Sequence, residues 1–172
     1  VWRTRIQMNR YRIGVLLYFR SLDDRLLLIR RSKAPNRDLW CAIGGKLEME
    51  TGESPFECAR REAEEEVGME IADSNLSLRC ILSEVDYEGT GHWLMFIFVV
   101  EKRLARLPSD IEEGEFGFFE RSELPDLSMP ALDRSILTDR ILNGNEKSLD
   151  SIHAGLSSTG EPNSMQIEQS IG

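Results

Sequence analysis

Apolar residues gather in short segments along the chain, and polar, turn-forming residues separate those segments. Residues 11–19 and 25–31 are rich in β-branched, aromatic and leucine side chains and flank a tetrad of turn-forming residues. This pattern predicts a β-hairpin. Residues 76–87 and 92–101 flank a glycine-bearing segment at 88–91 in the same way, which predicts a second hairpin.

The segment 92–101 is apolar at almost every position instead of alternating. A strand of this kind is buried on both faces, as happens in a sheet with helices on each side. Residues 39–43 are a short segment that leads into the glycine pair at 44–45, where a loop begins. Residues 116–120 are a short strand candidate, and residues 131–142, introduced by Pro130, have the pattern of a final helix. We therefore predict an α/β fold with a mixed β-sheet between helical layers.

Length and composition narrow the class of protein. The 172 residues make one domain of ordinary size. A net charge of −9 disfavours binding to the phosphate backbone of nucleic acids, and no apolar run approaches the roughly 20 residues of a membrane span. Three cysteines without paired spacing indicate neither a disulfide framework nor structural zinc. We expect a cytoplasmic protein that binds neither nucleic acid nor membrane, and its oligomeric state stays open.

The two ends of the chain differ in composition from its centre. We expect residues 1–8 to be a disordered start and residues 9–144 to form the domain. Residues 145–172 are rich in Gly, Ser, Asn, Glu and Gln and have too few apolar side chains to offset the entropy lost on ordering. They are predicted to be a disordered polar tail, so that a chain ending at Gly144 should keep its fold.

The clearest helix signal along the chain begins at Ser54. Ser54 is suited to the N-cap, Pro55 to the first helical position, and Glu57 to the completion of a capping box. Gly68 supplies the stop. The spacing predicts an amphipathic helix between these residues.

One flank of this helix is strongly acidic. Glu62, Glu65 and Glu66 lie at i, i+3 and i+4, so their carboxylates gather beside the apolar stripe. A solvated acidic face is one explanation. The other is a divalent cation, because Mg²⁺ prefers carboxylates together with substrate phosphates. The loop at 44–52 enters the same helix, and its glycines let backbone groups approach a metal and phosphates closely.

These residues resemble the Nudix box, which runs glycine, five residues, glutamate, seven residues, and then Arg-Glu-hydrophobic-any-Glu-Glu-any-Gly-hydrophobic. Glu53 and residues 61–69 match every fixed position of its second half. In the first half, seven residues instead of five separate Gly45 from Glu53, which indicates a two-residue loop insertion. A looser similarity to MutT-like proteins extends over about 11–142. The resemblance implies a Nudix-like α/β/α sandwich.

The resemblance also implies a metal site. Glu62, Glu65 and Glu66 are expected to bind Mg²⁺, for which Mn²⁺ could substitute, and the Gly44 carbonyl is expected to be a further ligand. The implied reaction is hydrolysis of a nucleoside diphosphate linked to another group, in which water attacks phosphorus and the metal shares the charge.

Two further roles follow from the same resemblance. Arg61, held by Glu53, is expected to orient the metal-binding carboxylates, a supporting role for a residue that does not itself bind the metal. Either Glu62 or Glu115, in the acidic loop at 112–115, is the expected general base.

The favoured substrate is a nucleoside triphosphate, including an oxidised one such as 8-oxo-dGTP, cleaved to the monophosphate and pyrophosphate. MutT-like relatives contact the base with an acidic residue at a similar distance beyond a segment like 118–125, and Asp133 occupies that place. Asp133 is expected to contact the purine edge. The alternative is a first-turn aspartate stabilised by the helix macrodipole.

Other functions are weighed against this one. Nudix relatives that cleave dinucleoside polyphosphates tend to have a tyrosine sixteen to eighteen residues beyond the box. Tyr87 lies eighteen residues past Met69, so the resemblance leaves a dinucleoside polyphosphate hydrolase as an alternative. Nudix relatives that cleave ADP-ribose tend to carry a proline about fifteen residues beyond the box. No proline occurs between Pro55 and Pro108, so the resemblance disfavours an ADP-ribose hydrolase. A Nudix-fold module that senses a nucleotide without cleaving it is a further alternative, although such modules usually have a broken box.

The remaining candidate residues have simpler explanations. The aromatic side chains of 93–98 are expected in the core, and His92 is expected to be structural. Cys58 lacks a recognisable histidine partner for nucleophilic catalysis. The basic residues of 30–33 are expected to be solvated charges.

Overall fold

The computed structural model describes residues 11–87, 91–145, 147–156 and 162–172. The predicted start at 1–8 and most of the turn at 88–91 lie outside these residues. Within them, the strands form one mixed sheet of eight, in the order β3-β2-β1-β5-β4-β7-β8 with β6 beside β2. The strands are β1 (Arg12–Arg20), β2 (Leu26–Arg31), β3 (Trp40–Cys41), β4 (Leu76–Val85), β5 (Trp93–Val100), β6 (Gly114–Phe119), β7 (Leu149–Leu156) and β8 (Pro162–Ile171).

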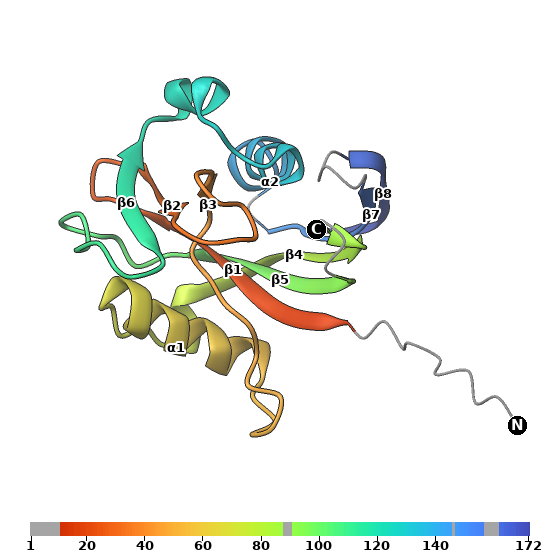
Figure 1. Cartoon of the computed structure of the whole chain (residues 1–172), viewed down its shortest axis with the longest axis horizontal. Helices are drawn as coiled ribbons and strands as arrows, with labels where there is room; N and C mark the ends of the chain where they lie inside the picture. Colours follow the sequence, from red (N-terminus) through yellow and green to blue (C-terminus); the bar gives the residue numbers. More distant parts are fainter. Residues whose placement is uncertain (1–10, 88–90, 146, 157–161) are drawn as a thin grey trace, which may run out of the picture.

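Helices cover both faces of the sheet (Figure 1). The helices are α1 (Pro55–Val67), the 3₁₀ turns η1 (Asp73–Asn75) and η3 (Arg121–Asp126), α2 (Ala131–Ile136) and the π-helical η4 (Leu137–Leu142). One core cluster lies between the sheet and α1, and the other lies between the sheet and α2 with η4. The predicted α/β sandwich is confirmed. No helix in the described ranges is long and apolar enough to cross a membrane.

Both predicted hairpins are present as antiparallel pairs, β1 with β2 and β4 with β5. The sheet is mixed because β1 runs parallel to β5 and β4 runs parallel to β7. Strand β5 is buried on both faces as predicted: Met95 and Ile97 belong to the α2-side core, and Phe98 and Val100 belong to the α1-side core.

A glycine-containing segment completes the edge of β1. Only the end of β1 pairs with β2. Further back, the Val15 N–H donates to the Gly45 carbonyl at 2.9 Å, and the Leu17 N–H donates to the Ile43 carbonyl at 2.7 Å. These bonds hold Gly44 and Gly45 against the centre of the sheet. A Cβ atom on Gly44 would lie 2.0 Å from the Val15 carbonyl oxygen, so only glycine fits there.

The prediction of a disordered tail at 145–172 is wrong for the described part of that segment. β7 pairs in parallel with β4, and β8 pairs with β7. Ile152 and Ala154 are 1% and 0% exposed and belong to the α2-side core. The open edge of β4 supplies a row of backbone partners, so two inward apolar side chains suffice to order a strand whose composition is otherwise polar.

A buried arginine ties this hairpin to the rest of the domain. Arg79 on β4 is 5% exposed and donates to the carbonyl of Asn145 at 2.6 Å and to that of Ser148 at 3.3 Å. Asp150, which is also buried, pairs with Arg140 at 3.6 Å. The segment that leads from η4 to β7 is therefore fixed by charge-assisted hydrogen bonds.

Candidate active site

Helix α1 has the ends that its sequence predicts. The Ser54 side chain accepts from the Glu57 N–H, and the Glu57 carboxylate accepts from the Ser54 N–H at 2.8 Å, which completes the capping box. Gly68 ends the helix with φ 68°. Ala59 and Ala63 are fully buried in the α1-side core, which turns the acidic flank toward the glycine segment.

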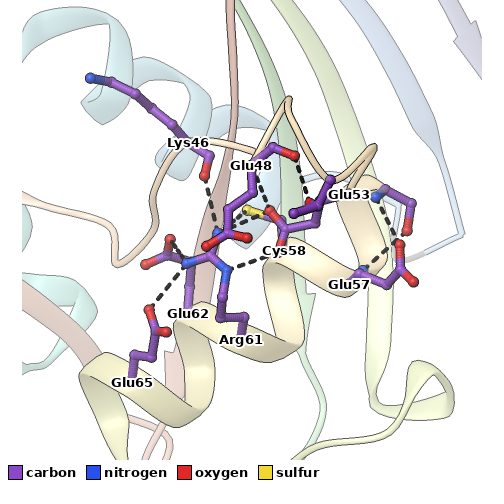
Figure 2. Close-up of polar contacts among 10 residues, drawn as sticks. Lys46, Glu48, Glu53, Glu57, Cys58, Arg61, Glu62 and Glu65 are labelled. Atoms are coloured by element: carbon purple, nitrogen blue, oxygen red, sulfur yellow. Dashed lines mark hydrogen bonds and ion pairs between the residues drawn. The ribbon is translucent and has the colours of Figure 1, made fainter.

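Arg61 is the centre of the polar network on that flank (Figure 2). Its guanidinium donates to both carboxylate oxygens of Glu53, at 2.8 and 3.0 Å. It also donates to Glu62 Oε1 at 2.7 Å, to Glu65 Oε2 at 3.1 Å and to the Lys46 carbonyl at 3.1 Å. Hydrogen bonds to Arg61 hold the pKa of Glu53 below its ordinary value. The predicted contact between Glu53 and Arg61 is present.

The two-residue insertion forms a compact turn without disturbing this contact. The Glu53 and Thr51 N–H groups both donate to the Glu48 carbonyl, and the Glu48 N–H donates back to Glu53 Oε2 at 2.8 Å. Met49, at the tip of the turn, is 65% exposed. The extra residues therefore extend into solvent while Glu53 keeps its place beside the helix.

The glutamates of the acidic flank differ in environment. Glu62 is 7% exposed, and burial raises its pKa. Burial also raises the pKa of Glu66, to about 7, with the charges of Glu62 and Glu113 adding to the effect. Glu65 has a side chain that is 60% exposed. Two partly desolvated carboxylates near further negative charge are costly to keep ionised, and a cation would relieve that cost.

The glycine segment touches these carboxylates directly. A Cβ atom on Gly45 would lie 2.0 Å from Glu62 Oε1, so the carboxylate occupies space that only glycine leaves free. A backbone hydrogen bond from Gly44 partly offsets the rise in the pKa of Glu66. The glycine segment therefore lies against Glu62 through Gly45 and against Glu66 through Gly44, and the role of these groups as metal ligands stays a prediction.

The donor set fits a hard divalent cation such as Mg²⁺, since it consists of carboxylate and backbone oxygens. Within the described residues, however, no three acidic, histidine or cysteine groups converge as a finished metal site. Glu62 and Glu65 bond to Arg61 in this arrangement. The exposed Glu65 side chain can rotate away from Arg61 without displacing any buried group.

Glu115 does not join the other carboxylates. It lies on β6 directly opposite Arg30 of β2 and forms an ion pair with that residue at 3.2 Å. Its neighbour Phe116 packs into the α1-side core, so the alternation of the strand directs Glu115 to the opposite face. Glu113, in the same acidic loop, is the residue whose charge acts on Glu66.

A cavity of about 240 Å³ adjoins the glycine segment. Its floor is the α2-facing side of the sheet, where Arg12, Trp93 and Glu84 lie side by side on β1, β5 and β4. Gly44 and Gly45 line the cavity as well as contacting the glutamates of α1. The cavity and the acidic flank thus share one stretch of backbone that carries no side chains.

Basic and aromatic groups gather at this cavity. The Arg12 guanidinium lies 5.5 Å and the Lys46 ammonium 5.8 Å from the centroid of the Trp93 ring. Arg31 also lines the cavity and lowers the pKa of Glu66. Trp93 packs against the α2-side core, as the sequence predicts, and also lines the cavity. Arg31, predicted to be a solvated charge, is half-buried at the cavity.

Two acidic side chains also line the cavity. Asp133 projects there from the first turn of α2, and burial raises its pKa to about 6. Glu84, which the sequence analysis missed, is 7% exposed, and burial together with the charge of Asp133 raises its pKa to about 8. The sequence did contain a signal for Glu84. Cys80 and Leu82 lie on the inward face of β4, and the alternation of the strand places Glu84 on that same face, where a carboxyl group is unusual.

The residues given simpler explanations behave mostly as expected. Burial, with the charges of Glu53 and Glu62, raises the pKa of the Cys58 thiol to about 12, which disfavours its nucleophilic thiolate. The His92 ring accepts a hydrogen bond from the Asp86 N–H at 3.1 Å, a structural contact within the hairpin.

Comparison with known proteins places this arrangement in a family. The NUDIX domain model matches residues 9–139. The chain belongs to the Nudix family. As a member it is a hydrolase of the kind that acts on nucleoside diphosphate derivatives, and such hydrolases generally use divalent metals.

Three curated relatives are similar to this chain, and the names of two of them give different substrates. The chain is 33% identical to the uncharacterized Nudix hydrolase YvcI of Bacillus subtilis, over 67% of this chain and 70% of that protein. It is 29% identical to the ADP-ribose pyrophosphatase of Methanocaldococcus jannaschii, over 62% and 60%. It is 30% identical to the human 8-oxo-dGDP phosphatase NUDT18, over 64% of this chain and only 33% of that protein.

A solved structure supports the extent of the fold. The MutT protein from Bacillus halodurans superimposes with a TM-score of 0.72 at 25% identity, over 91% of this chain and 97% of that one. A superposition over 91% of this chain is longer than residues 1–144 alone, so the similarity extends into the β7–β8 hairpin.

Proposed function

We propose that this Nudix hydrolase cleaves a nucleoside triphosphate, including one with an oxidised purine, to the monophosphate and pyrophosphate. The observation that carries the proposal is the shared backbone of Gly44 and Gly45. It adjoins the carboxylates of α1 and also lines a cavity with basic groups at its rim and acidic groups within it. A phosphate chain at the carboxylates and a base in the cavity would be joined across this backbone.

The metal would be held by Glu62, Glu65 and Glu66, with the Gly44 carbonyl as a further ligand. A bound divalent cation would neutralise the phosphate oxygens and lower the pKa of water. Arg61 holds Glu62 and Glu65 in place and is itself held by Glu53. Arg12, Lys46 and Arg31 supply positive charge for the remaining phosphate oxygens.

Of the two glutamates predicted as general base, Glu62 has the supporting geometry. It is buried beside the glycine segment, and burial raises its pKa, which makes the carboxylate a better proton acceptor. Glu115 forms an exposed ion pair with Arg30 across the β2–β6 pair instead of joining the α1 carboxylates.

The size of the cavity supports one nucleoside in preference to two. Its volume of about 240 Å³ is below the roughly 300–1,000 Å³ typical of sites that enclose larger ligands. Tyr87, which suggested a dinucleoside polyphosphate, is 7% exposed and its hydroxyl donates to Asn36. This ring forms part of the cavity wall and has no broad face free to stack on a second base.

A hydrolysis panel tests the proposal. The purified chain is incubated with Mg²⁺ and, separately, with dGTP, 8-oxo-dGTP, dATP, ADP-ribose or diadenosine tetraphosphate, and the products are identified by mass. We expect a nucleoside triphosphate to have the highest kcat/KM and to release pyrophosphate. A higher kcat/KM on ADP-ribose or on the dinucleotide would reject the triphosphate assignment, and full activity in excess chelator would reject the metal.

Glu53→Gln tests the positioning role of the Arg61 contact. The amide loses the charge that Arg61 pairs with, so we expect kcat to fall about 10–100-fold and the Mn²⁺ concentration for half-maximal activity to rise. KM should change little, because Glu53 does not reach the cavity. Glu50→Gln, in the same loop and exposed, is the matched control. An unchanged Mn²⁺ requirement in Glu53→Gln would show that the contact only stabilises the loop.

A further inference from the structure

Strand β8 forms an open edge of the sheet. It is the last strand in the sheet order and, within the described residues, pairs only with β7 (Figure 1). An edge of this kind presents a row of backbone N–H and C=O groups that can pair with a further strand. The side chains from 164 to 171 are all exposed, so no other part of the described structure covers β8.

Apolar side chains lie on this edge strand. Met165, Ile167 and Ile171 are 44%, 40% and 57% exposed. Met165 lies opposite Ala154 and Ile167 lies opposite Ile152, and both of these β7 residues belong to the α2-side core. The edge strand therefore continues an apolar row of the core into solvent.

We propose that β8 pairs antiparallel with β8 of a second copy of this chain, so that the two sheets join across a twofold axis at Gln166. Such an interface is isologous, because the same strand is used by both copies. A twofold axis perpendicular to the sheet keeps the α2 sides of both copies together. Directly opposite residues of an antiparallel pair share a face, so the axis has to pass through a residue and not between two residues.

The sequence of β8 favours Gln166 as that residue. With the axis there, Met165 of each copy lies opposite Ile167 of the other, which pairs both exposed apolar side chains on the α2 side. The two Gln166 amides meet on the opposite face, where each can donate to the other. An axis at Ile167 would leave Met165 opposite the polar Gln169, and an axis at Met165 would leave Ile167 without an apolar partner.

Charge is compatible with this register. Glu168 is the only charged residue from 162 to 172, and it lies opposite Ser164 of the second copy and not opposite its own counterpart. The Glu168 carboxylate accepts a hydrogen bond from the Ser151 hydroxyl at 3.0 Å, which holds it toward β7. The pairing therefore brings no like charges into direct contact.

The dimer should be weak and favoured by salt. The register of β8 against β7 shifts on both sides of residues 164–167, so the regular part of the edge is short. We expect a Kd on the order of 10–100 µM, as for other small interfaces. Each chain has a net charge of −9, so added salt should strengthen association by screening the repulsion between copies.

Disulfide trapping tests the register directly. In Gln166→Cys the two introduced thiols face each other across the axis, with Cβ atoms about 5 Å apart, a distance that a disulfide can close. Ser164→Cys is the matched control on the same strand. Its two introduced thiols are about 13 Å apart, because each lies opposite Glu168 of the second copy, four residues away. The three native cysteines are all buried, so the wild-type chain supplies the background.

Sedimentation velocity of the full chain measures the association itself. Ile167→Lys places a charge in each apolar pair, and we expect the Kd to rise about tenfold or more. Leu22→Lys changes a leucine that is 72% exposed in the turn after β1 and should leave the Kd unchanged. Gln166→Cys should cross-link about tenfold faster than Ser164→Cys under the same mild oxidation.

Several results would overturn the proposal. These are a chain that stays monomeric up to about 500 µM, a dimer that persists in Ile167→Lys, a dimer that weakens as salt is added, and equal cross-linking of the two cysteine variants. If Ile167→Lys releases β8 from β7, the cross-linking comparison still decides the question. None of these measurements requires turnover, so their outcome is independent of the proposed function.

Discussion

Glu66→Gln is expected to lower kcat by about a hundredfold or more and, without divalent cation, to raise the stability of the fold. The loss of activity follows because a carboxylate that holds the metal contributes several kcal/mol of transition-state stabilisation. The gain in stability follows from the pKa of Glu66, which burial and the charges of Glu62 and Glu113 raise to about 7. The change in stability should be about 1–3 kcal/mol.

The pH dependence has a definite sign. The folded chain binds the Glu66 proton more tightly than the unfolded chain does, whose pKa for this group is near the ordinary 4.5. The free energy of unfolding therefore falls as pH rises from about 4.5 to about 7. The uncharged amide avoids this loss, so the advantage of the variant should be present at pH 8 and absent at pH 4.

Melting curves and kcat measured together test this prediction. At pH 8 in chelator the variant should melt above the wild type. Added Mg²⁺ should raise the melting temperature of the wild type by ligand linkage, and that of the variant much less. Glu64→Gln, on the exposed side of the same helix, should match the wild type in both readouts. A variant with normal kcat, or one destabilised in chelator at pH 8, would contradict the assigned role of Glu66.

Removal of everything after Gly144 is expected to lower the melting temperature by about 10 °C or more, or to abolish the cooperative transition. Burial of one large aliphatic side chain contributes about 1.5–3 kcal/mol, and Ile152 is 1% exposed. The truncation would also uncover Leu82 on β4 and remove two of the carbonyl partners of the buried Arg79, those of Asn145 and Ser148. In a chain of this size each kcal/mol corresponds to roughly 2–4 °C.

A second truncation provides the control. A chain that ends at Leu156 keeps β7 and loses β8, whose described side chains from 164 onward are exposed. It should melt within a few degrees of the full chain. If the chain ending at Gly144 also melted within a few degrees, β7 would contribute little and the original prediction of a dispensable tail would be restored.

The local elements follow from the sequence because their signals are short-range. The capping box of Ser54 and Glu57 and the stop at Gly68 depend on residues within one turn of each other. The unbroken apolar run of β5 indicates burial on both faces. The contact between Glu53 and Arg61 also follows from the box pattern, and the two-residue insertion leaves it intact because the extra residues form a turn of their own.

The pairing of β7 with the open edge of β4 could not be predicted from composition. Residues 145–172 lack apolar content, and taken alone they could not offset their ordering entropy. The unpaired edge of β4, the carbonyl contacts of Arg79 and two inward side chains supply what the segment lacks. None of these partners is near the segment in sequence, so no local pattern could reveal them.

The sequence by itself determined the sandwich, the ends of α1 and the acidic flank that would hold a metal, since each depends on spacing along one element. Only the tertiary structure decided which glutamate of the 112–115 loop acts on that flank. It also decided that Trp93 and Glu84 line a cavity opposite Asp133. The alternation of side chains along a strand sets the face of the sheet on which a residue lies. The side chains that it contacts on that face come from other elements, which are distant in sequence. Those side chains, through desolvation and charge, decide whether a buried glutamate is a structural residue or a binding one.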